Sequence, residues 1–111
     1  MYLRLVRTVI APGMADAYWK WSREILDLWD EHGVLRAGGP YATTGPGGEG
    51  VAVWLSLHDS EEQMREQFRV MYSEGRGREL IGRRPALVSA TTEGWYPEWD
   101  TDGPALLPPA W

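Results

Sequence analysis

The stretch VAVWLSLHDSEEQ, residues 51–63, changes from one periodicity to another. Residues 51–58 alternate in polarity, which predicts a half-buried strand, because successive side chains of a strand point to opposite faces. From Ser60 the pattern becomes helical, and Ser60 and Gln63 stand at the spacing of a capping box. His58 lies at the junction, either as a catalytic group at a cavity or as a bystander beside the helix cap.

The flanking sequence completes a β-α-β-β-α-β order. The predicted strands cover residues 2–10, 34–43, 51–58 and 86–95, and the predicted helices cover residues 13–32 and about 60–72. Gly38, Gly39 and Pro40 weaken the second strand, which predicts an edge position with a bulge. RELIG, residues 78–82, predicts one further helical turn before Pro85.

This order predicts a ferredoxin-like α+β domain over residues 1–96. We expect a four-stranded antiparallel sheet in which the first strand lies between the fourth and the third, and the second strand forms the far edge. Both helices then cover one face. Residues 97–111 contain four prolines, which predicts a Pro-rich extended C-terminal tail.

The two faces of the third strand differ in chemistry. Val51, Val53, Leu55 and Leu57 form an apolar face, which we expect to lie under the helices. The opposite, mixed face carries Ala52, Trp54, Ser56 and His58, and the neighbouring strands add Val6, Ile10, Leu87 and Trp95. That face is too apolar to stand in water. A second copy of the sheet is the economical cover, which predicts a homodimer.

Composition narrows the class of protein. The chain has 111 residues, a formal charge of −5, no cysteine and two histidines. This acidity argues against nucleic-acid binding, which depends on phosphate neutralisation. Neither a dedicated metal site nor a resident cofactor is expected, and no segment resembles a membrane span or a signal peptide. The expectation is a cytoplasmic protein with no membrane partner.

The segments LRLVRTVIAPG, residues 3–13, and VAVWLSLHDSEEQMREQF, residues 51–68, together with a hydrophobic last strand, resemble the dimeric α+β barrel superfamily. The similar branches are the NIPSNAP/EthD-like and antibiotic-biosynthesis-monooxygenase-like ones. The resemblance implies a barrel of two sheets with a pocket inside the barrel or between each sheet and its helices. Members include cofactor-independent monooxygenases, polyketide cyclases and haem-degrading enzymes. The absence of histidine from residues 60–72 argues against the haem-degrading branch.

Antiparallel pairing is expected to gather His58, Tyr2, Arg4, Glu93 and Trp95 at one end of the mixed face. Here His58 is the candidate general base, Glu93 could orient it, and Arg4 could bind an enolate, phenolate or carboxylate oxygen. The alternative for Arg4 and Glu93 is a structural ion pair between adjacent strands.

Four aromatic residues are candidates for binding a flat ligand: Trp54, Trp95, Tyr2 and Tyr41. Two other features have ordinary interpretations. GPGGEG, residues 45–50, lacks the Lys-Ser/Thr of a phosphate-binding loop and predicts a hairpin turn. The arginines of the second half predict a solvated helix face, with capture of an anionic substrate as the alternative: Arg65, Arg69, Arg76, Arg78, Arg83 and Arg84.

Two functions remain open from the sequence. The first is a small cofactor-independent enzyme, an oxygenase or cyclase acting on a flat hydrophobic polyketide- or quinone-like compound in secondary metabolism. The second is a non-catalytic ligand-binding or accessory protein that uses the same aromatic-lined pocket. The cluster around His58 favours the enzyme, and the lack of a strict catalytic motif favours the binding protein.

Overall fold

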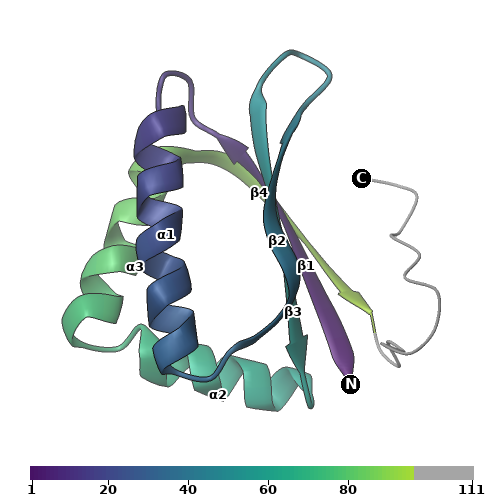
Figure 1. Ribbon diagram of the computed structural model, residues 1–111, viewed down its shortest axis with the longest axis vertical. Helices are drawn as coiled ribbons and strands as arrows, with labels where there is room; N and C mark the ends of the chain where they lie inside the picture. Colours follow the sequence, from purple (N-terminus) through teal and green to yellow (C-terminus); the bar gives the residue numbers. More distant parts are fainter. Residues whose placement is uncertain (97–111) are drawn as a thin grey trace.

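A four-stranded antiparallel sheet backed by three helices forms the fold of this computed structural model, which describes residues 1–96. The strands are β1 (Tyr2–Ile10), β2 (Leu35–Thr44), β3 (Gly50–His58) and β4 (Val88–Tyr96), in the order β2-β3-β1-β4. All three helices lie on one side of the sheet (Figure 1). The ferredoxin-like α+β class and the strand order are therefore as predicted. The predicted tail, residues 97–111, lies outside the described residues.

The helices are α1 (Ala15–Glu31), α2 (Glu61–Met71) and α3 (Gly75–Leu87). Ser60 caps α2, because its hydroxyl accepts the backbone N–H of Gln63 at 3.0 Å, as the capping-box spacing predicted. The edge strand β2 has register shifts around Gly38, which confirms the predicted bulge. None of the helices in residues 1–96 is long and apolar enough to span a bilayer.

The third helix corrects the prediction of a single turn. α3 runs for 13 residues and contains Pro85 in its last turn, where the missing N–H costs one helical hydrogen bond, the one to the carbonyl of residue 81. Gly75 and Gly77, in the first turn of α3, made the sequence resemble a loop, but Gly77 has a packing role. A Cβ on Gly77 would collide with the backbone carbonyl of Met71 and touch Leu28 of α1. Gly77 thus permits the close turn from α2 into α3.

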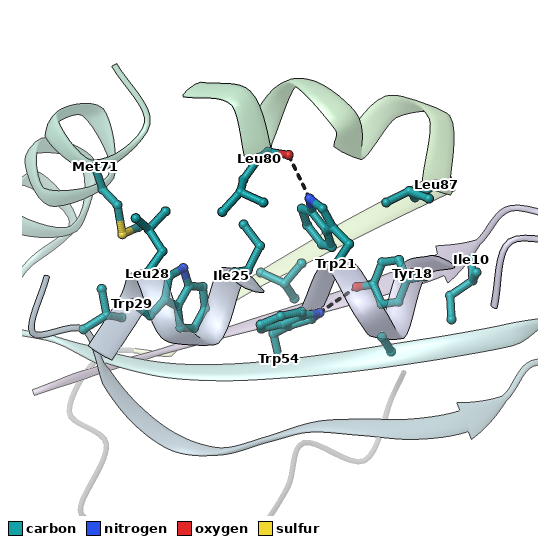
Figure 2. Packing of buried hydrophobic residues seen from close by; sticks show 13 residues of the cluster. Ile10, Tyr18, Trp21, Ile25, Leu28, Trp29, Trp54, Met71, Leu80 and Leu87 are labelled. Carbon is teal, nitrogen blue, oxygen red and sulfur yellow. Dashed lines mark hydrogen bonds between the residues drawn. The ribbon is translucent and has the colours of Figure 1, made fainter. Parts of the chain in front are cut away.

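The two faces of the sheet are exchanged relative to the prediction. Trp54 and Ala52 of β3 pack with Val6 and Ile10 of β1 against Tyr18 and the other apolar residues of α1 (Figure 2). Residues 51, 53 and 55 instead form a second buried cluster with Leu3 and Leu5 on the opposite face. We predicted the helix-covered face from its apolarity alone, and this prediction was wrong because both faces are buried. The mixed face keeps its polar groups under the helices by pairing them with one another.

Candidate functional site

A cavity of about 310 Å³ lies between the mixed face of the sheet and the helices. This volume is at the lower end of the range for small-molecule sites. The exposed lining residues Thr91 and Glu93 belong to the edge strand β4, so the cavity opens at that edge. The lining consists of Arg4, Val6, Thr8, Tyr18, Trp21, Ile25, Trp29, Trp54, Phe68, Tyr72, Ile81, Arg84, Thr91 and Glu93.

Two tyrosine hydroxyls in the lining are each held by an indole. Trp54 Nε1 donates to Tyr18 Oη at 2.8 Å (Figure 2), and Trp29 Nε1 donates to Tyr72 Oη at 2.9 Å. Burial raises the pKa of both tyrosines above the usual value of 10.0, although the indole hydrogen bonds oppose this. Both phenols therefore stay protonated at neutral pH. Because each oxygen accepts an indole N–H, its own hydrogen can still be donated, either to a ligand oxygen or, at Tyr18, to the nearby hydroxyls of Thr8 and Ser22.

Arg4 forms the wall at one end of the cavity. Its Nε donates to Glu93 Oε1 at 3.0 Å, and its guanidinium lies 5.2 Å from the centre of the Phe68 ring. The predicted juxtaposition of Arg4 and Glu93 is therefore observed. The negative charge of Glu93 compensates Arg4, so this end of the cavity carries a neutral, stacked pair.

His58 lies behind that wall and is not among the cavity residues. Its ring stacks on Trp95 and meets the Phe68 ring edge to face, with centroids 6.1 Å and 5.6 Å apart, and it is 2% exposed. Ser56 Oγ lies 2.7 Å from His58 Nε2, while Nδ1 has no partner within residues 1–96. From the sequence we expected Glu93 to orient the imidazole. The partner is Ser56 instead, which points to the same face from two residues earlier on β3.

The environment of His58 favours the neutral imidazole. Burial, and secondarily the charge of Arg4, lower its pKa from 6.5 to about 4, and Asp59 opposes this only in part. At neutral pH His58 is uncharged, and it is a weaker base than an exposed histidine.

The remaining candidates fall into two places. Tyr2 stacks on Trp95 with ring centroids 5.1 Å apart, so both join His58 at the predicted end of the face, next to the cavity but not in its lining. Tyr41 pairs with Val53 and therefore points to the opposite face, where it is 54% exposed. Of the four predicted ligand-binding aromatics, Trp54 alone lines the cavity.

The sequence interpretation missed three polar lining residues: Tyr18, Tyr72 and Arg84. Both tyrosines lie in the predicted helices, residues 13–32 and about 60–72, and were given no role in the site. Arg84 was assigned to a solvated helix face, with capture of an anionic substrate as the alternative. The available signal was the tyrosine type itself, because a hydroxyl inside an apolar stripe needs a partner. Arg84 has no signal that separates it from its exposed neighbour Arg83.

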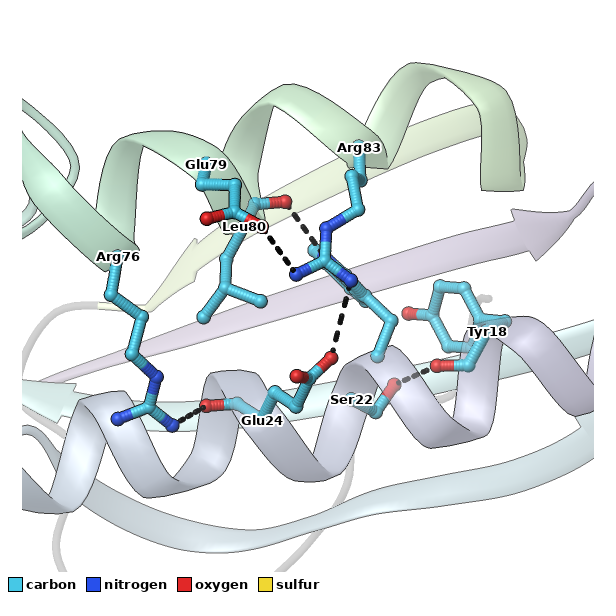
Figure 3. A network of polar contacts seen from close by, with 8 residues as sticks. Tyr18, Ser22, Glu24, Arg76, Glu79, Leu80 and Arg83 are labelled. Carbon is cyan, nitrogen blue, oxygen red and sulfur yellow. Dashed lines mark hydrogen bonds and ion pairs between the residues drawn. The ribbon is translucent and has the colours of Figure 1, made fainter.

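Helices α1 and α3, which wall the cavity, are held together by polar contacts. Trp21 Nε1 donates to the backbone oxygen of Leu80 at 2.7 Å in the buried layer (Figure 2). On the outside, Arg83 of α3 reaches Glu24 of α1 and also Glu79 of its own helix, and Arg76 donates to the carbonyl of Glu24 (Figure 3). Arg76 also pairs with Glu31 of α1. The buried bond fixes the spacing of the two walls, while each exposed pair contributes less.

Comparisons with known proteins show which solved structures share this fold. No protein-family model matches the chain, and no curated protein matches its sequence. Solved structures do match. A NIPSNAP domain protein from Burkholderia xenovorans, itself uncharacterised, is 13% identical with a TM-score of 0.70, over 91% of this chain and 97% of its own.

Two further structures agree with the first. A NIPSNAP family protein of unknown function from Agrobacterium tumefaciens is 18% identical, with a TM-score of 0.67 over 86% of this chain and 85% of its own. An antibiotic biosynthesis monooxygenase is 12% identical, with a TM-score of 0.59 over 90% of this chain and 100% of its own. The chain has the fold shared by NIPSNAP and antibiotic-biosynthesis-monooxygenase proteins. This confirms the resemblance that the sequence indicated.

Proposed function

We propose that the protein is a small enzyme, an oxygenase or cyclase without a resident cofactor, acting on a flat hydrophobic compound of polyketide or quinone type. The observation that carries the proposal is the aromatic cavity with two phenolic donors, Tyr18 and Tyr72, each held by an indole. Aromatic walls favour planar rings, and fixed O–H donors stabilise negative charge on a ligand oxygen. The monooxygenase of the same fold supports this class of reaction.

Both reactions begin with the same step. A carbon next to a carbonyl, or conjugated with it through an aromatic ring, loses a proton to a base, and the electron pair left behind is shared with the carbonyl oxygen as an enolate or phenolate. Tyr18 and Tyr72 would donate hydrogen bonds to that oxygen. In a cyclase the enolate carbon then attacks a second carbonyl of the same molecule. In an oxygenase it reacts with O₂, one oxygen atom becoming a new carbonyl and the other leaving as water.

A suitable test uses an anthrone, a three-ring ketone with an acidic central carbon, and measures oxygen uptake and anthraquinone formation. We expect Tyr18→Phe or Tyr72→Phe to lower turnover roughly a hundredfold to a thousandfold, because each removes one donor to the enolate. Tyr41→Phe is the matched control, since Tyr41 lies on the opposite face. If wild type binds the anthrone but oxygen uptake is no faster than without protein, oxygenase activity on this substrate class is rejected.

The non-catalytic alternative has an observation of its own. Within residues 1–96 the cavity lining contains a single carboxylate, Glu93, which is engaged by Arg4, and no histidine. His58 as general base stays a prediction, and its proton path would have to pass the Phe68 and Trp95 rings. In the same assay, His58→Gln should cost about a hundredfold to ten-thousandfold if His58 is the base. Tight binding with no turnover favours the binding protein.

The homodimer is also a proposal, now through the face opposite to the one predicted. Leu3, Leu5 and residues 51, 53 and 55 form an apolar cluster there, and no helix of residues 1–96 lies on that side (Figure 1). Leu35 and Tyr41 extend the cluster along β2, and both are more than half exposed. The cluster itself is already buried within one subunit, so the part that a second copy of the sheet would cover is the exposed pair on β2, Leu35 and Tyr41. The cavity of each subunit would stay accessible from its β4 edge.

A further inference from the structure

The end of the cavity opposite Arg4 also carries a guanidinium, but in a different setting. Arg84 Nη2 donates to Thr91 Oγ1 at 2.8 Å and to Thr8 Oγ1 at 3.4 Å. Both acceptors are neutral hydroxyls, and no carboxylate within residues 1–96 pairs with Arg84. The side chain is half-buried and lines the cavity. Its positive charge is therefore directed into the cavity without compensation from the described residues.

The contrast with the other arginines is informative. Arg4, the other guanidinium of the cavity, is paired with Glu93, and most surface arginines also pair with a carboxylate. Arg7, Arg23 and Arg78 make no ion pair within residues 1–96, but none of them lines this cavity. A half-buried guanidinium without a charged partner is partly desolvated, and an anion that joins it offsets this cost. Its fork of donors matches the two oxygens of a carboxylate.

Neighbouring donors point to the same kind of ligand group. Tyr18 approaches this end of the cavity, and the charge of Arg84 acts on its hydroxyl, opposing the rise in the pKa of Tyr18. Thr8 and Thr91 fix the guanidinium without neutralising it. Arg84 and Tyr18 together therefore offer N–H and O–H donors to one oxyanion, while aromatic rings continue from there toward Arg4.

We propose that Arg84 forms an anion subsite that selects flat aromatic compounds carrying a carboxylate at one end. The inference rests on the proposed function, in that it assumes a planar ligand in this cavity. Arg4 and Thr8 are four residues apart on β1, which separates the two ends by roughly 13 Å at the rise of a strand. That length suits about two or three fused rings, with the carboxylate at Arg84 and the apolar edge at the Arg4–Phe68 wall.

The test compares two ligands that differ only in the charged group, a hydroxynaphthoate and the corresponding naphthol, by quenching of tryptophan fluorescence in the full chain. Wild type should bind the acid at least tenfold more tightly, and added salt should weaken this preference. Arg84→Gln should lower affinity for the acid by about ten- to a hundredfold and leave the naphthol unchanged. Arg84→Lys should recover part of the loss. Arg83→Gln, in the same helix but paired on the surface, is the matched control and should change neither affinity.

The possible outcomes test the anion subsite and the binding of flat aromatic compounds separately. Equal affinity of wild type for the two ligands, or an equal effect of Arg84→Gln on both, overturns the anion subsite while leaving a cavity that binds flat compounds. Failure of both ligands to bind to wild type overturns the proposed binding of flat aromatics as well. If Arg84→Gln does not fold, as judged by circular dichroism, the wild-type preference and its salt dependence still decide the question.

Discussion

At the scale of single residues, the buried imidazole of His58 is expected to make stability depend on pH. Its pKa falls from 6.5 to about 4 on folding, so between these values the unfolded chain binds a proton that the folded chain does not. Stability is then complete above pH 6.5 and declines as the pH falls toward 4, by about 3 kcal/mol in all. Urea unfolding of wild type and His58→Gln at several pH values measures this. Parallel pH profiles for the two proteins would contradict it.

The residues of the cavity also show which parts of the site could be predicted from the sequence and which could not. The register of β1, β3 and β4 could be predicted from alternation, and it brought Arg4, Glu93 and Trp54 to the right face. The residue type of Tyr18 shows that its hydroxyl needs a partner, but not that the partner is a ligand, because a buried tyrosine in a helix stripe looks the same whether or not a cavity lies beside it. Arg84 differs from Arg83 only in the direction of its side chain.

At the scale of elements, the strands were predictable because their period of two is strict and their ends are marked by glycine, proline or a helix cap. The choice of the helix-covered face was not predictable, since both faces are apolar enough to be buried. α3 was underestimated because Gly75 and Gly77 have poor helix propensity. Tertiary packing overrides that propensity where Gly77 meets the Met71 carbonyl.

Two glycines of α3 give a matched pair of substitutions. Gly77→Ala should destabilise the fold by roughly 1–3 kcal/mol, because its Cβ collides with backbone that cannot move cheaply. Gly82→Ala meets nothing within 4 Å and should stabilise by up to about 1 kcal/mol through helix propensity. Thermal unfolding followed by circular dichroism compares them. If Gly77→Ala were as stable as Gly82→Ala, the packing account of the α2–α3 turn would fail.

At the scale of the whole molecule, the proposed dimer makes a prediction about mass. Light scattering should give about 25 kDa, twice the 12.6 kDa of the chain. Leu35→Asp with Tyr41→Asp should yield a folded monomer, because both side chains are already exposed in the single subunit. Trp54→Asp should instead unfold the subunit, since Trp54 lies in the core under the helices. A monomeric wild type at micromolar concentration would exclude the dimer under those conditions.

The central claim is that a flat ligand binds between the helices and the mixed face of the sheet. A crystal structure of the full chain with a bound dihydroxyanthraquinone tests it most directly. We predict that the rings lie against Trp54 and Trp29, with a ligand oxygen within hydrogen-bond distance of Tyr18 Oη. A ligand bound instead on the opposite face, against Leu35 and Tyr41, would contradict the claim.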